Sequence, residues 1–117
     1  MKGILLRTNN YIDAIDFGET IELHDLQNAV NGYIEIVYAV GLPRGYVMVV
    51  NEEGLLRDLE PNLLASLLYG VKEHGQIIVG NALILRDIVT QEGDRDLGGL
   101  SEDDIRNIGV ALRAVIG

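Results

Sequence analysis

Arginine side chains are the groups in this sequence best suited to binding an anion. Five of them are spread over the chain, at Arg7, Arg44, Arg57, Arg86 and Arg113. A guanidinium group can hold a carboxylate or a phosphate through two parallel hydrogen bonds. These arginines would line an anion-binding pocket if the fold gathered them, but their spacing alone does not predict that it does.

Amides and carboxylates near predicted turns complete the polar groups from which a binding site could be built. Glu52 and Glu53 are adjacent on a predicted turn, where both carboxylates would be solvated. General acid–base catalysis instead needs two carboxylates whose environments separate their pKa values. We therefore predict no catalytic residue. The candidate ligand-binding residues are Asn51, Glu52, Glu53, Asn62, Asn81, Arg44 and Arg86.

The sequence contains none of the usual motifs for cofactors, metals or nucleophiles. His24 and His74 have no second histidine or carboxylate at the spacing of a helical metal site. There is no cysteine, which excludes a thiol nucleophile, a disulfide framework and Cys-ligated zinc. Neither a Gly-x-Ser-x-Gly elbow nor a glycine-rich phosphate loop occurs. We predict no cofactor and no metal site.

Acidic residues are concentrated near the end of the chain. We expect residues 87–100 to form a flexible acidic loop and residues 101–116 to form the C-terminal helix, with Ser101 as its N-cap. Acidic groups in the first turn would complement the helix dipole. No register of this segment fits a calcium loop. Seven of the 18 acidic residues lie here: Asp87, Glu92, Asp94, Asp96, Glu102, Asp103 and Asp104.

Hydrophobic patterning predicts the elements that would position these side chains. Residues 33–40 are rich in β-branched and aromatic types and form the clearest strand, and residues 46–50 should pair with them as a hairpin. Further strands are expected at 2–7, 11–17, 55–59 and 76–86, and helices at 23–31, 61–68 and 101–116. Gly32 is the expected left-handed C-cap of the first helix. These elements predict an α+β fold with a mainly antiparallel sheet of about five strands and two or three helices packed on it.

Composition limits the class of protein. The chain has 117 residues, 48% of them apolar, and a net charge of −9. It should form a single domain over residues 1–117 with a substantial core. No apolar run approaches the roughly 18 residues of a membrane helix, so we expect no membrane segment, and the N-terminus does not resemble a signal peptide. The acidic charge argues against direct binding to nucleic acid.

Four segments, in order, carry a family resemblance: LQNAVNGYIEIVYAV, VVNEEGLLRDLEPN, IIVGNALIL and LSEDD. Together they resemble the small proteins grouped as domain of unknown function 3846, over about Leu23 to Ile105. The chain departs from the family's usual Leu-Pro-Pro-Asn-Arg at residues 59–63 and from its usual Gly-Asp at Gly80-Asn81. Members occur in phages, plasmids and bacterial mobile elements. The resemblance implies an accessory protein in the cytoplasm of a bacterial host and assigns no catalytic residue.

Two functional hypotheses follow from these features. The first is a non-enzymatic binding protein that counters host defence by sequestering a small, nucleotide-like ligand at an oligomer interface, or by occupying a host protein. The apolar helix at residues 63–68 offers surface for a homo-oligomer. The second is an acidic DNA mimic that blocks a restriction or other DNA-binding enzyme through the segment 87–104. An enzyme acting through carboxylates, tyrosines or arginines is a weaker third possibility.

Overall fold

A computed structural model describes all 117 residues, and its centre is one antiparallel sheet. The strand order is β2-β1-β5-β4-β3, and β6 pairs with the second half of β5. The central strand β5 and its two neighbours, β1 and β4, hold most of the buried strand residues. The strands are β1 (Lys2–Leu6), β2 (Ile12–Asp16), β3 (Ile34–Val37), β4 (Tyr46–Asn51), β5 (Ala82–Val89) and β6 (Arg95–Gly98).

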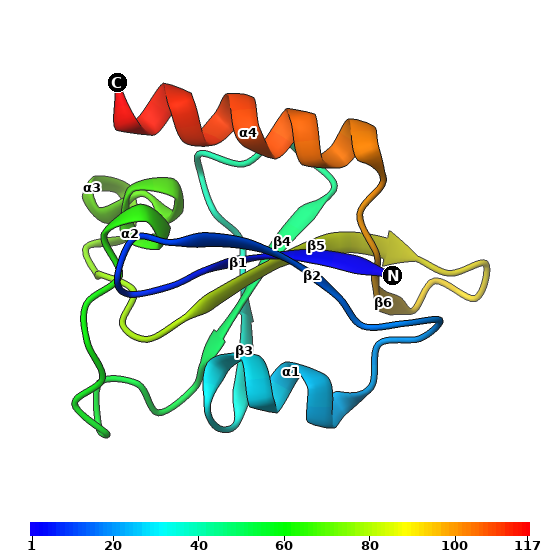
Figure 1. The fold of residues 1–117 in the computed structure, drawn as a ribbon, viewed down its shortest axis with the longest axis horizontal. Coiled ribbons are helices and arrows are strands. Elements are labelled where there is room, and N and C mark those ends of the chain that lie inside the picture. The colour runs from blue at the N-terminus through cyan, green and yellow to red at the C-terminus, as the bar shows by residue number, and fades with distance from the viewer.

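Helices cover both faces of this sheet. Figure 1 shows α4 crossing one face and α1 lying on the other, with α2 and α3 beside α4. The helices are α1 (Leu23–Val30), α2 (Leu63–Tyr69), α3 (Val71–His74) and α4 (Glu102–Ile116). The predicted α+β fold with an antiparallel sheet is therefore confirmed, with six strands and four helices. None of these helices has the length and apolar character required to cross a membrane.

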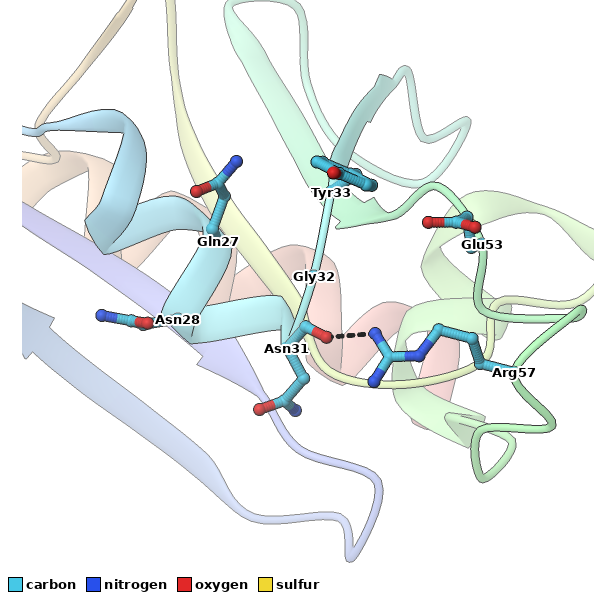
Figure 2. Close-up of a pocket in the computed structure, with 7 residues that line it drawn as sticks. All are labelled: Gln27, Asn28, Asn31, Gly32, Tyr33, Glu53 and Arg57. Atoms are coloured by element: carbon cyan, nitrogen blue, oxygen red, sulfur yellow. Dashed lines mark hydrogen bonds between the residues drawn. The ribbon is translucent and has the colours of Figure 1, made fainter.

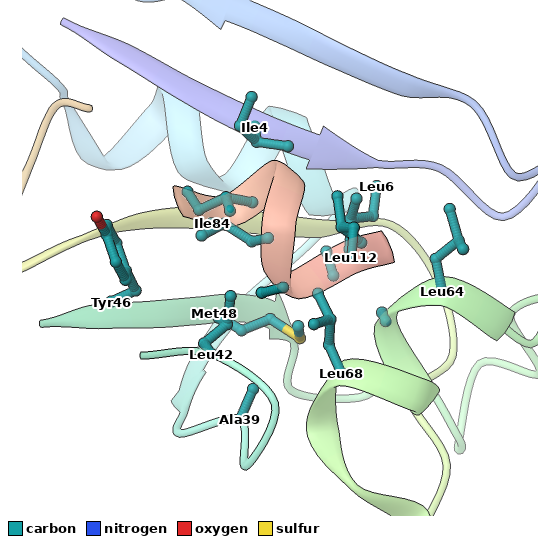
Figure 3. Packing of buried hydrophobic residues seen from close by; sticks show 14 of the residues in the cluster. Ile4, Leu6, Ala39, Leu42, Tyr46, Met48, Leu64, Leu68, Ile84 and Leu112 are labelled. Atoms are coloured by element: carbon teal, nitrogen blue, oxygen red, sulfur yellow. The ribbon is translucent and has the colours of Figure 1, made fainter. Parts of the chain in front are cut away.

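The larger hydrophobic core fills the space between the sheet and helices α2 and α4. It contains 17 buried residues, against six in the core under α1. Figure 3 shows Met48 and Ile84 reaching from the middle strands toward Leu68 of α2 and Leu112 of α4. The alternation of side chains along β4 and β5 supplies both cores, because successive residues point to opposite faces.

Helix α4 begins as its sequence predicts. The Ser101 hydroxyl accepts a hydrogen bond from the Asp104 N–H at 3.1 Å, and the Asp104 carboxylate accepts one from the Ser101 N–H at 2.8 Å. This capping box satisfies backbone donors that the first turn leaves free. Ile108 and Leu112 are buried on the side of α4 that faces the sheet.

Three local predictions are wrong. Residues 87–100 form the β5–β6 hairpin rather than a loop, because backbone pairing from Arg86–Gly98 to Val89–Arg95 orders a polar segment. Residues 55–59 form turns instead of a strand, with Leu55 and Leu56 exposed. The strand expected from residue 76 begins only at Ala82.

Two predicted helix boundaries also move. Pro61 does not occupy the first turn of α2; it lies outside the helix and bridges to Val79, and Asn62 is the N-cap. The left-handed C-cap of α1 is Asn31, with φ 65°, rather than Gly32. Asparagine reaches this conformation at lower cost than most residues.

Candidate functional site

A polar pocket of about 490 Å³ lies where α1 ends and β3 begins. Its wall comes from three segments: the last turns of α1, the connection to β3, and the turns that follow β4 (Figure 2). We call it the α1–β3 pocket, and its lining residues are Gln27, Asn28, Asn31, Gly32, Tyr33, Glu53 and Arg57.

Arg57 is held in the pocket by the end of α1. Its guanidinium donates a hydrogen bond to the Asn31 carbonyl oxygen, the contact drawn in Figure 2. Gly32 leaves room for this arrangement, because a Cβ at that position would lie 2.6 Å from the Arg57 Nη1 atom. Arg57 belongs to no ion pair, so its remaining N–H groups are free for a ligand.

The buried side chain of Asn51 fixes the two sides of the pocket relative to each other. Its Nδ2 donates to the Val30 carbonyl at 2.9 Å, and its Oδ1 accepts from the Glu53 N–H at 2.8 Å. One amide thus ties the last residue of α1 to the turn that carries Glu53. Asn51 is only 6% exposed, and both ends of its amide bind backbone groups.

Several lining side chains have unused hydrogen-bonding capacity. The amides of Gln27, Asn28 and Asn31 make no hydrogen bond within the protein, and Glu53 has no cationic partner. Tyr33 is 64% exposed and presents a flat aromatic surface. The pocket therefore combines free donors, free acceptors, one guanidinium and one aromatic ring.

Two neighbouring hollows share residues with this pocket. Both include Asn31 and Asn81, and both include Arg7. Asn81 is partly committed, because it accepts from the Thr8 N–H at 3.3 Å and donates to the Ala29 carbonyl at 3.4 Å. Arg7 is paired with Asp13. The α1–β3 pocket is thus the part of this surface with the most unpaired polar groups.

The structure does not bring the seven predicted ligand-binding residues into one site. Glu53 lines the α1–β3 pocket, Asn81 lies in the adjoining hollows, and Glu52 faces a different, mainly apolar groove. Asn51 and Asn62 are buried and bind backbone groups. The sequence alone could not distinguish a structural asparagine from a ligand-binding one. The burial of both side chains and their bonds to backbone groups indicate a structural role.

The predicted arginines Arg44 and Arg86 lie at the other end of β4. Arg44 is exposed beside a hollow that also contains Tyr38 and Arg95. Arg86 stacks over the Tyr46 ring at 5.3 Å and pairs with Asp104 at 3.5 Å. Arg86 is therefore engaged inside the protein, in the contact between β5 and α4.

The residues that sequence reasoning missed are those contributed by the end of α1. Arg57 belonged to the wider set of candidate arginines, but nothing in the sequence marked it as one that has no carboxylate partner and lines a pocket. The one local signal was the Asn31-Gly32 pair after a predicted helix, which indicates a helix end. The missed lining residues are Gln27, Asn28, Asn31, Gly32 and Tyr33.

Asp104 is the centre of a second polar cluster. Its carboxylate accepts a hydrogen bond from the Tyr46 hydroxyl at 2.6 Å and lies 3.5 Å from Arg86. Partial burial raises the pKa of Asp104, but hydrogen bonds from the Ser101 backbone, Tyr46 and the Ser101 hydroxyl, together with Arg86, outweigh it and hold the pKa below the ordinary 3.8.

This lowered pKa predicts an acid-dependent contribution to stability. A carboxyl whose pKa falls on folding stabilises the protein fully above its unfolded value and loses that effect as the pH falls through its folded value. We expect the Tm difference between the unmodified protein and Asp104→Asn to be largest above pH 3.8 and to shrink below it. Thermal denaturation followed by circular dichroism measures it. The exposed Asp94→Asn should show little difference at any pH, and a pH-independent difference at Asp104 would contradict the prediction.

Cations offset much of the acidic segment. Asp87 pairs with Arg95, Glu102 with Lys2, Asp103 with Arg106, and Asp104 with Arg86. Four of its seven acids thus have a partner within 4.0 Å. No group of three or more histidine, cysteine or acidic side chains is arranged to hold a metal ion.

The fold and the pocket define a small α+β protein whose sheet is covered on both faces and which carries a polar pocket at the end of α1. The sequence profile of the family described as domain of unknown function 3846 (DUF3846) matches residues 1–110. The chain belongs to this family, which the ordered segments of the sequence had indicated. No curated protein and no solved structure matches it.

Proposed function

We propose that the protein is a binding protein for a small, nucleotide-like ligand, which occupies the α1–β3 pocket. The observation that carries this proposal is Arg57, an unpaired guanidinium anchored on the Asn31 carbonyl among free amides. A charged group held in place before binding costs less ordering when the ligand arrives.

Each part of such a ligand has a chemical counterpart in the pocket. A phosphate would pair with the free N–H groups of Arg57. The exposed ring of Tyr33 would stack on a base, and the amides of Gln27 and Asn28 offer the paired donors and acceptors that base edges recognise. The Glu53 carboxylate would accept hydrogen bonds from sugar hydroxyls, as acidic residues do in dinucleotide sites.

A stoichiometric binder of this kind acts by removing its ligand from solution. That role fits a small accessory protein of a phage or mobile element that counters a host defence, the setting which the family resemblance implies. It needs no reacting group, only an affinity high enough to hold the ligand at its cellular concentration.

The test is isothermal titration calorimetry of the purified protein with mononucleotides, dinucleotides and cyclic nucleotides. We expect at least one class to bind, and Arg57→Gln to weaken it about tenfold or more, because a hydrogen bond to a charged group contributes about 1.5–3 kcal/mol. Arg113→Gln is the matched control, since Arg113 is also exposed and unpaired but lies on α4. Absence of binding by every class, or equal losses in both variants, would contradict the proposal.

The DNA-mimic hypothesis predicts a different result in the same set of experiments. A mimic would bind a basic DNA-binding protein, and its affinity would fall steeply with added salt. The four ion pairs in the segment 87–104 reduce the free negative charge available for such a contact. Nucleotide binding that persists at high salt therefore distinguishes the two.

A further inference from the structure

Strand β3 is a free edge of the sheet whose backbone groups have no partner on the outer side. It pairs only with β4, with Glu35 opposite Val50 and Val37 opposite Met48. The Glu52 N–H donates a hydrogen bond to the Tyr33 carbonyl at 2.8 Å, so the backbone groups of Tyr33, and of every second residue after it, point toward β4. Because this alternates along an antiparallel strand, Ile34 and Ile36 direct their N–H and C=O groups away from the sheet.

The side chains along this edge are unusually apolar for an exposed strand. Ile36 is 43% exposed, and Tyr38, just beyond the strand, is 56% exposed. Natural proteins protect free edges with lysine, proline, inward-pointing charges or bulges. The strand β3 is short and Glu35 places one charge on the face of the sheet that carries α2 and α4, but the segment from Tyr33 to Tyr38 has no lysine, proline or bulge.

The opposite edge of the sheet provides a contrast within the same molecule. On β2, the residues whose backbone groups point outward are Ile12, Ala14 and Asp16, because Phe17 bonds inward to Met1. Asp13 and Asp16 place two carboxylates along this five-residue strand. Pairing of two β2 edges would bring four carboxylates together, although Arg7 and the N-terminal ammonium pair with Asp13 and Asp16, whereas two β3 edges bring together only two.

We propose that two copies of this chain pair antiparallel through β3 and form one continuous sheet across a two-fold axis. This inference rests on the sheet edge and is independent of the proposed ligand. The occupant is a second copy because the β3 edge is complementary to itself in one register. With the axis at Ile36, Ile36 lies opposite Ile36 of the other copy, and Ile34 lies opposite Tyr38.

The charge at Glu35 selects that register over its neighbour. An axis at Glu35 would set the two Glu35 carboxylates directly opposite each other, which is destabilising. An axis at Ile36 instead sets Glu35 opposite Val37, on the face that packs against α2 and α4. The exposed side chain of Val40, at 58%, follows the strand and extends the contact beyond it.

The first experiment measures the mass in solution by sedimentation equilibrium. We expect twice the 12.8 kDa chain mass for the unmodified protein and a single chain for Ile36→Lys, with an unchanged circular dichroism spectrum. Ile12→Lys is the matched control: Ile12 is 46% exposed on the other edge strand and should leave the dimer intact. A monomeric unmodified protein, a dimer that survives Ile36→Lys, or loss of the dimer in Ile12→Lys would overturn the proposal.

The second experiment tests the register through cross-linking. The chain has no cysteine, so a single introduced cysteine can bond only to its copy. Facing residues of a hydrogen-bonded antiparallel pair have Cα atoms about 5.5 Å apart, within disulfide range. Ile36→Cys should therefore form a disulfide dimer under mild oxidation, and Ile34→Cys, which faces Tyr38 of the other copy, should not. The reverse pattern would contradict the axis at Ile36.

Discussion

Replacing Asn62 with alanine is expected to lower the free energy of unfolding by about 3–5 kcal/mol, since it removes a helix cap and leaves buried carbonyls unpaired. Asn62 is fully buried. Its Nδ2 donates to the carbonyls of Leu6 and Gly80, each at 2.9 Å, and its Oδ1 accepts from the Ala65 N–H at 3.1 Å. One side chain thus joins the end of β1, the start of β5 and the first turn of α2.

Urea denaturation measures this loss, and Asn81→Ala provides the comparison. Asn81 is also an asparagine that bonds across segments, but it is only partly buried and its bonds are longer, at 3.3 and 3.4 Å. Its removal should cost about 1 kcal/mol. Similar losses in the two variants would mean that the three-way contact at Asn62 contributes no more than an ordinary surface amide.

Leu68→Ala should destabilise the protein by about 2–5 kcal/mol, the range for leucine truncation in a packed core. Leu68 has no exposed surface, and its side chain points from α2 into the core between the sheet and α4 (Figure 3). The surrounding elements cannot all close on the space that its side chain leaves. Leu67 is the control, because it is the preceding residue of the same helix and is 40% exposed.

Leu67→Ala should cost about 1 kcal/mol on the same measurement, because Leu67 keeps 40% of its surface in water and its truncation leaves no closed cavity. Equal losses at the two positions would contradict the packing described for α2. The comparison also bears on the apolar character of this helix. Two of its four leucines, Leu64 and Leu68, belong to the hydrophobic core, whereas Leu63 and Leu67 lie on the surface.

The sequence correctly predicted the elements in which the hydrophobic pattern matches the burial of the side chains in the structure. The β3–β4 hairpin followed from β-branched residues on both sides of a turn, and α4 followed from its Ser101 cap and apolar stripe. Polar composition was misleading at residues 95–98, because a strand held by backbone bonds needs no apolar side chains. Leucines were misleading at residues 55 and 56, where apolar side chains lie in an exposed turn.

The candidate site was less predictable, for a physical reason. The α1–β3 pocket joins residues 27–33 to Glu53 and Arg57, and no spacing in the sequence encodes that meeting. Whether an arginine is free depends on its tertiary neighbours: Arg86 lies against Asp104, but Arg57 lies against a backbone carbonyl. Likewise, the predicted residues Asn51 and Asn62 prove to be buried structural amides.

The position of β1 in the sheet has a consequence for folding of the chain during its synthesis. β1 pairs with β2 within the first 16 residues, but its other neighbour is β5, where Leu5 meets Leu83. The Lys2 carbonyl also accepts a bond from the Leu100 N–H at 2.8 Å. The N-terminal hairpin can therefore form early but remains without its second neighbour until most of the chain has left the ribosome. Contacts between residues so far apart in the sequence slow folding. The sheet is complete only when β1, from the first third of the chain, pairs with β5, from the last third.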